Sequence, residues 1–132
     1  MSSSQHLTSR INAEKDEMAQ PTIDQTTFDE LKETAGAEFV GELVDTFLGE
    51  APAMLDELRR SLDAGDADRF RRAAHSLKSN SHTFGAMTLG AMARELELGG
   101  IASVRNAGAA PLDALTTEYS RVAAALTALK NA

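Results

Sequence analysis

Apolar side chains recur at every third or fourth position from 39 to 62, and this run constrains the fold more than any other segment. The spacing is typical of a helix with one apolar face and predicts a helix over 37–62. Pro52 lies inside the run, where it removes a backbone hydrogen bond and crowds the preceding turn. Because the apolar face keeps its phase across Pro52, we expect one helix with a kink near 49–52. The apolar positions are Phe39, Val40, Leu43, Val44, Phe47, Leu48, Ala51, Met54, Leu55, Leu58 and Leu62.

Helical signals also flank this run. A short helix is predicted to start at Thr27, because Thr27 and Glu30 have the spacing of a capping box, and to end at Gly36. Asp66 is the expected N-cap of a helix that ends near Phe84.

The remainder of the chain predicts two more helices. One is expected over 86–98, ended by Gly99 and Gly100, and a loop is expected over 101–110. The last helix is predicted to have Pro111 in its first turn, where the missing N–H costs nothing. Its apolar side chains form a bundle seam at Leu112, Leu115, Tyr119, Val122, Leu126 and Leu129.

Helices of these lengths joined by short connections pack antiparallel. The predicted fold class is therefore all-α, an antiparallel four-helix bundle with a short N-terminal accessory helix. Positions 1–21 are predicted to be a flexible tail, with a short helix around 11–18 as an alternative, and 22–132 the bundle domain. His6 belongs to the tail, and Met54, Met87 and Met92 are expected to fill the core.

Composition excludes several classes of protein. A length of 132 residues suits one domain, and the absence of cysteine excludes disulfides and thiolate metal sites. A net charge of −7 argues against a nucleic-acid partner. No apolar run approaches the roughly 18 residues of a membrane span, and the start lacks a signal-peptide pattern. We therefore expect a cytoplasmic monomer without a membrane partner.

The helix predicted after Asp66 turns one histidine away from its own core. At about 100° per residue, its apolar positions cluster within about 50° of one line, whereas His75 lies about 140° away and should face solvent. The clustered positions are Phe70, Ala73, Ala74, Leu77, Ser81 and Phe84.

Cations surround this histidine in a chain that is acidic elsewhere. Positions 66–85 carry four Arg or Lys against two Asp, a net charge of +2, which leaves −9 for the remainder. Arg71, Arg72 and Lys78 share a face with His75, so they form either a solvated helix face or a docking patch for an acidic partner.

The cations also bear on the chemistry of the imidazole. Its ordinary pKa is near 6.5, so much of it is neutral and nucleophilic at neutral pH. The nearby cations are expected to favour that neutral form and to offset the charge of a phosphoryl group.

The residues around His75 resemble the histidine phosphotransfer (HPt) family. His75-Ser76-Leu77-Lys78 matches the family's His-x-Leu-Lys, Gly85-Ala86 falls at the expected distance, and Leu89 and Leu96-Glu97 follow. The resemblance covers roughly 22–129. Two positions depart from the family pattern: Ser79 replaces the usual Gly, and His82 replaces a small residue.

This resemblance implies a phosphorelay role. The phosphoryl group would pass from the aspartate of one receiver domain to Nε2 of His75 and then to the aspartate of a second receiver. The implied partners are the receiver domains of a hybrid sensor kinase and of a response regulator. The chain itself would need no cofactor, because the receiver would supply Mg²⁺.

The residues that share a helix face with His75 have expected roles of their own. Lys78 lies one turn from His75 and is expected to steady a phosphoryl oxygen. Ser79 is expected to leave room for a partner, or to bond its hydroxyl to Nδ1 of His75. His82 lies about 10 Å from His75 and is either part of the docking rim or a rival phosphorylation site. The predicted partner-binding residues are Arg71, Arg72, Ser79, His82 and Gly85.

Two alternatives remain open, and two further functions are not supported. The chain could be a phosphotransfer domain cut from a larger kinase, or a helical adaptor that binds receivers without accepting phosphate. A metal-binding bundle lacks its usual Glu-x-x-His pairs. No phosphate-binding glycine motif is present, so we expect no ATP-dependent kinase activity. Glu95 and Glu97 are interpreted as solvated surface carboxylates.

Overall fold

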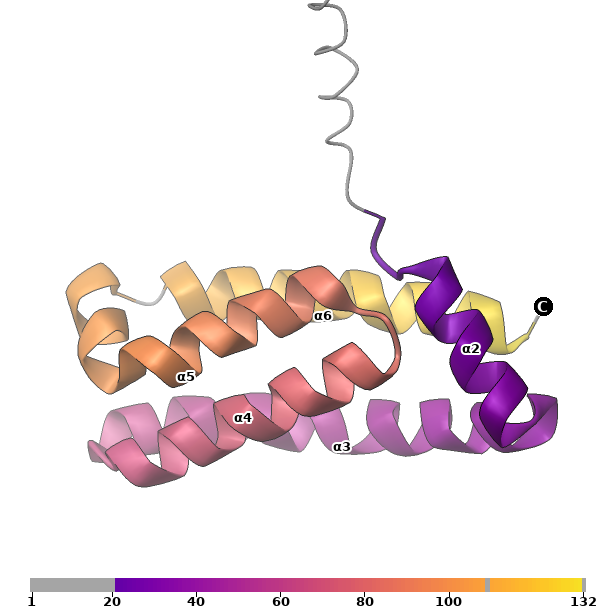
Figure 1. Ribbon diagram of the computed structural model, residues 1–132. Helices are drawn as coiled ribbons and strands as arrows, with labels where there is room; N and C mark the ends of the chain where they lie inside the picture. The colour runs from indigo at the N-terminus through magenta and orange to yellow at the C-terminus, as the bar shows by residue number, and fades with distance from the viewer. Residues whose placement is uncertain (1–20, 109, 132) are drawn as a thin grey trace, which may run out of the picture.

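The computed structural model describes residues 21–108 and 110–131. Within these ranges the chain forms five helices and no strand (Figure 1). They are α2 (Gln25–Ala35), α3 (Ala37–Ala64), α4 (Ala67–Thr83), α5 (Met87–Ala107) and α6 (Ala110–Lys130). The predicted tail, its alternative helix at 11–18 and His6 lie outside the described residues. The division into a tail over 1–21 and a domain over 22–132 stays a prediction.

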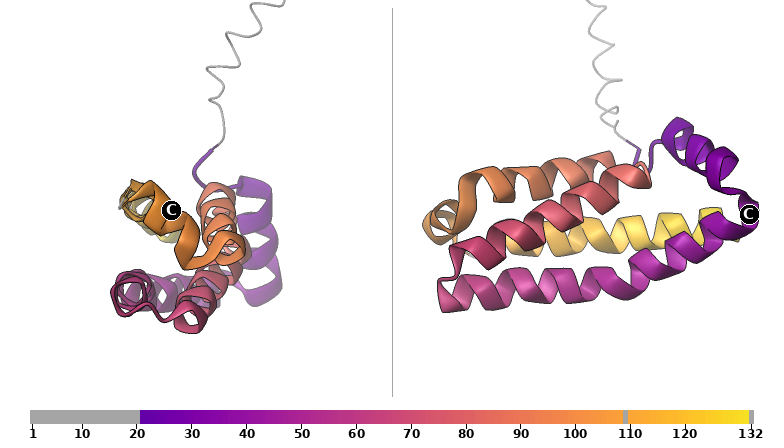
Figure 2. Two further views of the ribbon diagram at one scale, coloured as in Figure 1. Left: turned by 90° about the vertical axis from the view of Figure 1, so that its left-hand side faces the viewer. Right: turned by 60° about the horizontal axis from the view of Figure 1, so that its bottom comes forward.

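The four long helices form the predicted antiparallel bundle. Helix α4 packs against α3 on one side and α5 on the other, and α6 closes the bundle against α3 and α5 (Figures 1 and 2). The shorter α2 contacts α3 and α4 at one end. The all-α prediction, including the accessory helix, is confirmed. No helix in the described part of the chain is long and apolar enough to cross a membrane.

The core lies between the apolar faces of the four long helices. Val44, Phe70, Leu77, Leu89 and Leu126, drawn from α3, α4, α5 and α6, are almost completely buried. At the end near α2, the rings of Phe47 and Phe84 stack with their centroids 5.2 Å apart. The apolar periodicity therefore identified most of the buried faces. Phe39 of the predicted apolar run and Met87, expected to fill the core, are exceptions, because both side chains are exposed.

Helix α3 runs through Pro52 without a break, as predicted (Figure 2, right, where α3 bends in its N-terminal half). Proline has no N–H to donate to the carbonyl four residues earlier, which belongs to Leu48. The hydroxyl of Tyr119 on α6 lies 3.4 Å from this carbonyl oxygen and donates to it. A neighbouring helix thus supplies a donor where proline cannot.

The predicted start of α2 is wrong by two residues. The N-cap is Asp24, whose carboxylate accepts a hydrogen bond from the Thr27 backbone N–H at 3.0 Å, so Thr27 is not itself the cap. The Asp24 N–H also donates to the Gly85 carbonyl at 2.7 Å, which fixes the cap against the turn between α4 and α5. The predicted end of α2 at Gly36 is confirmed.

The loop expected over 101–110 is also wrong. Gly100 has a φ of 68° and interrupts α5, as the two glycines predict, but the chain continues as helix to Ala107. Ile101 and Val104 are buried there, one turn apart, and pack into the core. Their burial favours a further helical segment after the break.

Candidate functional site

The sequence of α4 places His75 on its outer side. Asp66 caps the helix as predicted, accepting a hydrogen bond from the Arg69 N–H at 3.1 Å. The opposite face is buried through Phe70, Ala74 and Leu77. The His75 side chain is therefore 56% exposed, which confirms its predicted outward position.

A carboxylate from the next helix holds this imidazole. Nδ1 of His75 lies 2.8 Å from Oε2 of Glu97 on α5. The other oxygen, Oε1, lies 3.0 Å from Nζ of Lys78 on α4. The side chain of Glu97 is only 17% exposed. A cation and an imidazole on α4 thus meet one largely buried carboxylate on α5.

The ionisation of Glu97 decides which nitrogen of His75 is free. The Lys78 ammonium, followed by the His75 imidazole, holds the pKa of Glu97 below its usual value, so this group is an ionised acceptor at neutral pH. An ionised carboxylate has no proton to give, so Nδ1–H must donate to Glu97. In the neutral imidazole the lone pair then lies on Nε2, the nitrogen that would act as nucleophile.

The two arginines near His75 are already paired. Arg71 binds one oxygen of Asp68, and Nη1 of Arg72 lies 3.1 Å from the other. All three side chains are more than half exposed. The charged group in contact with His75 is the Glu97 carboxylate rather than an arginine. The expectation that the nearby cations offset the charge of a phosphoryl group stays a prediction.

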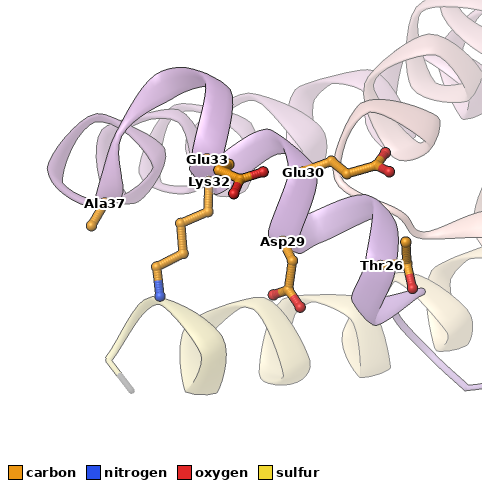
Figure 3. Close-up of a pocket in the computed structure, with 6 residues that line it drawn as sticks. All are labelled: Thr26, Asp29, Glu30, Lys32, Glu33 and Ala37. Carbon is orange, nitrogen blue, oxygen red and sulfur yellow. The ribbon is translucent and has the colours of Figure 1, made fainter.

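His75 borders a shallow open hollow of about 430 Å³, lined by Arg71, Arg72, His75, Ser76 and Glu97. A larger hollow of about 510 Å³ lies along α2 (Figure 3) and is lined by Thr26, Asp29, Glu30, Lys32, Glu33 and Ala37. There Glu30 points away from Asp29 and Lys32, so the charged groups do not converge. The larger hollow has no histidine in its lining, so the chemistry of the imidazole rather than the size of the hollow identifies the site at His75.

The other predicted site residues lie in different settings. Ser79 is exposed one turn from His75, which fits the expectation of a small residue there. The suggested bond from its hydroxyl to Nδ1 of His75 is wrong, because Glu97 occupies that nitrogen. His82 is exposed on the same side of α4, with its ring against Gly90 of α5.

Gly85 does not join this surface. It is buried in the turn between α4 and α5 with a φ of 85°, and a Cβ there would lie 2.8 Å from the Asp24 carbonyl oxygen. Only glycine combines this conformation with this contact. We therefore remove Gly85 from the predicted partner-binding residues and assign it to the turn.

The interpretation of Glu97 as a solvated surface carboxylate is wrong, because its side chain is 17% exposed and contacts His75 and Lys78. Its proximity to His75 follows from the antiparallel pairing of α4 and α5, a non-local contact that helical spacing cannot reveal. The available signal was the Leu96-Glu97 pair, which belongs to the motif shared with the HPt family. In the described ranges no three His, Cys, Asp or Glu side chains are grouped to hold a metal ion.

Comparison with known proteins identifies the family of the chain. The model of the Hpt domain family matches residues 42–132. The chain belongs to this family. The crystal structure of the histidine-containing phosphotransfer protein B (HptB) from Pseudomonas aeruginosa PAO1 is 28% identical, with a TM-score of 0.72. The match covers 86% of this chain and 97% of HptB. No curated protein matched.

As an Hpt domain, the chain has a histidine phosphotransfer role in phosphorelays, where Hpt proteins interact with receiver domains. His75 and Glu97 both lie within residues 42–132, which the family model matches. The family and the bundle fold were both predicted from the sequence and are confirmed.

Proposed function

We propose that Nε2 of His75 is the atom that carries the phosphoryl group. The observation that supports this most strongly is the hydrogen bond from Nδ1 to Glu97, because it leaves the lone pair on the outward nitrogen of an exposed ring. His82, the rival site, has no comparable carboxylate contact among the described residues, and its Nε2 lies against Gly90.

The proposed transfer uses this lone pair in both directions. Nε2 attacks the phosphorus of a receiver's aspartyl phosphate, the bond from phosphorus to the carboxylate oxygen breaks, and the carboxylate leaves with the electron pair. The imidazole gains positive charge, which Glu97 stabilises through Nδ1–H. In the second transfer an aspartate oxygen attacks, the P–N bond breaks, and its electrons return to Nε2.

Lys78 has two roles in this proposal. It keeps Glu97 ionised from 3.0 Å away, and it supplies positive charge beside the incoming phosphoryl oxygens. Its ammonium is therefore shared between Glu97 and phosphate, rather than reserved for phosphate. Arg71 and Arg72 would contribute to docking, with their charge partly offset by Asp68.

We further propose that the two partners are the receiver domain of a hybrid sensor kinase and that of a response regulator. The receiver would supply Mg²⁺ and the acidic pocket, and the cationic side chains around His75 would complement that pocket. Positioning and electrostatics would carry most of the catalysis, as in other phosphoryl transfers.

The test uses receiver domains labelled with radioactive phosphate in the presence of Mg²⁺. Each is mixed with the wild-type chain, with His75→Gln and with His82→Gln. We expect acid-labile, base-stable label on the wild type and on His82→Gln, and none on His75→Gln. ATP alone should give no label.

Two results would overturn the proposal. Label lost only in His82→Gln would move the site by two turns of α4. Receivers that bind the chain but leave it unlabelled would favour an adaptor that does not accept phosphate.

A further inference from the structure

His82 and Gly90 form a close contact between α4 and α5. A Cβ at Gly90 would lie 2.5 Å from both Cδ2 and Nε2 of His82, which is closer than non-bonded atoms approach a Cβ in proteins. The imidazole therefore crosses from α4 and lies directly on the backbone of α5. Glycine is the one residue that leaves room for the ring in this position.

Backbone conformation does not explain the glycine at position 90. It lies inside α5, where alanine would favour the helix more. Its φ is not among the positive values found at the turn and helix-end glycines, so conformational freedom does not explain it. Gly49, inside α3, offers a contrast, because a Cβ there would meet nothing within 4 Å. The His82 ring thus occupies the space that a side chain at position 90 would need.

The contact fixes an exposed ring on the same side as the proposed acceptor. His75, Ser79 and His82 follow one another at intervals of four and three residues, so they share one face of α4. His82 remains exposed although one edge of its ring lies on Gly90. A side chain that is already held in place loses less rotamer freedom when a partner binds.

We propose that Gly90 positions His82 as a docking contact for receiver domains. This inference rests on the proposed function of His75. His82 lies about two turns, or roughly 10 Å, along α4 from His75, outside the reach of the phosphoryl group. It therefore affects how tightly a receiver docks and not the transfer step itself.

The experiment measures phosphoryl transfer from the receiver domain that labels the wild-type chain fastest, over a range of chain concentrations. The variants are His82→Ala, Gly90→Ala and the double variant, with Gly49→Ala as the matched helical glycine. We expect His82→Ala and Gly90→Ala each to raise the half-saturating concentration about three- to tenfold, a loss typical of one interface contact. The saturated rate should change little, and Gly49→Ala should behave as wild type.

The double variant separates positioning from a general effect on the fold. If Gly90 acts only through His82, adding Gly90→Ala to His82→Ala should cause no further loss. Additive losses, a lower saturated rate, or unchanged half-saturation in both single variants would overturn the inference. A wild-type chain that accepts no label from any receiver would instead overturn the proposed function.

Discussion

Nδ1 of His75 on α4 lies 2.8 Å from Oε2 of Glu97 on α5. This contact joins the proposed phosphoryl acceptor to a carboxylate 22 residues later in the chain. Because Glu97 is ionised and paired with Lys78, Nδ1 of the imidazole is bound to a carboxylate and Nε2 is left to react.

Replacing Glu97 with Gln should slow transfer to His75. The neutral amide is a weaker acceptor for Nδ1–H and stabilises the positively charged imidazole less. We expect a fall of about tenfold in the saturated rate, equivalent to roughly 1.4 kcal/mol. Nitrogen NMR of His75 should show more of the tautomer protonated at Nε2. Glu95→Gln, an exposed neighbour on α5, is the control. An unchanged rate and tautomer in Glu97→Gln would remove Glu97 from the mechanism.

Acid should weaken the fold through carboxylates that are ion-paired when folded. Arg69 binds Glu57 through two nitrogens, at 2.6 and 2.9 Å, and holds the pKa of that carboxyl below its ordinary value of 4.5. A lowered folded pKa adds stability that is present above about pH 4.5 and lost as the pH falls through the folded value. The lowered pKa values of Asp24 and Glu97 act in the same direction.

Urea unfolding between pH 7 and pH 3 measures this effect. Glu57→Gln should be less stable than wild type at pH 7 and should lose less stability on acidification. Exposed Glu50→Gln should follow the wild-type curve. Equal slopes for wild type and Glu57→Gln below pH 4.5 would show that this ion pair does not contribute.

Tyr119→Phe should destabilise the bundle by about 0.5–1 kcal/mol, because it leaves the Leu48 carbonyl without its donor. Burial raises the pKa of Tyr119, so its hydroxyl stays protonated and donates. In a Pro52→Ala background the helix can supply its own donor, and the cost of Tyr119→Phe should shrink. A double-mutant cycle by urea unfolding tests the coupling, and strict additivity would refute it.

Ser81→Ala should stabilise the protein by about 1 kcal/mol. Its hydroxyl is completely buried on α4 and has no hydrogen-bond partner among the described residues. Ser61 is a matched control, because its equally buried hydroxyl donates to the Glu57 carbonyl at 2.7 Å. Ser61→Ala should lose about 1 kcal/mol. Thermal unfolding that moves both variants in the same direction would contradict this assignment.

The sequence predicted those parts of the fold that depend on local spacing. The apolar faces, the continuation of α3 through Pro52 and the outward position of His75 all follow from helical periodicity. The start of α2 was misjudged because Asp24 is anchored by Gly85, sixty-one residues away. The helix after Gly100 was missed because Ile101 and Val104 give too short an apolar pattern to predict it alone.

The site was predicted less completely, for a related reason. His75, Lys78 and Ser79 lie on one helix and could be placed on one face from their spacing. Glu97 lies on another helix, and its contact with His75 depends on how α4 and α5 align. The same alignment brings Gly90 beneath His82. Helical spacing gives the face of each helix, but not the register between two helices.

Because His75 and Glu97 belong to different helices, readiness to accept phosphate depends on the assembled bundle. A nascent or partly unfolded chain would already carry the histidine but would lack the carboxylate that selects its reactive nitrogen. Such a chain would compete poorly for phosphoryl groups. Phosphoryl transfer would then be restricted to correctly folded molecules, and no separate quality-control step would be needed.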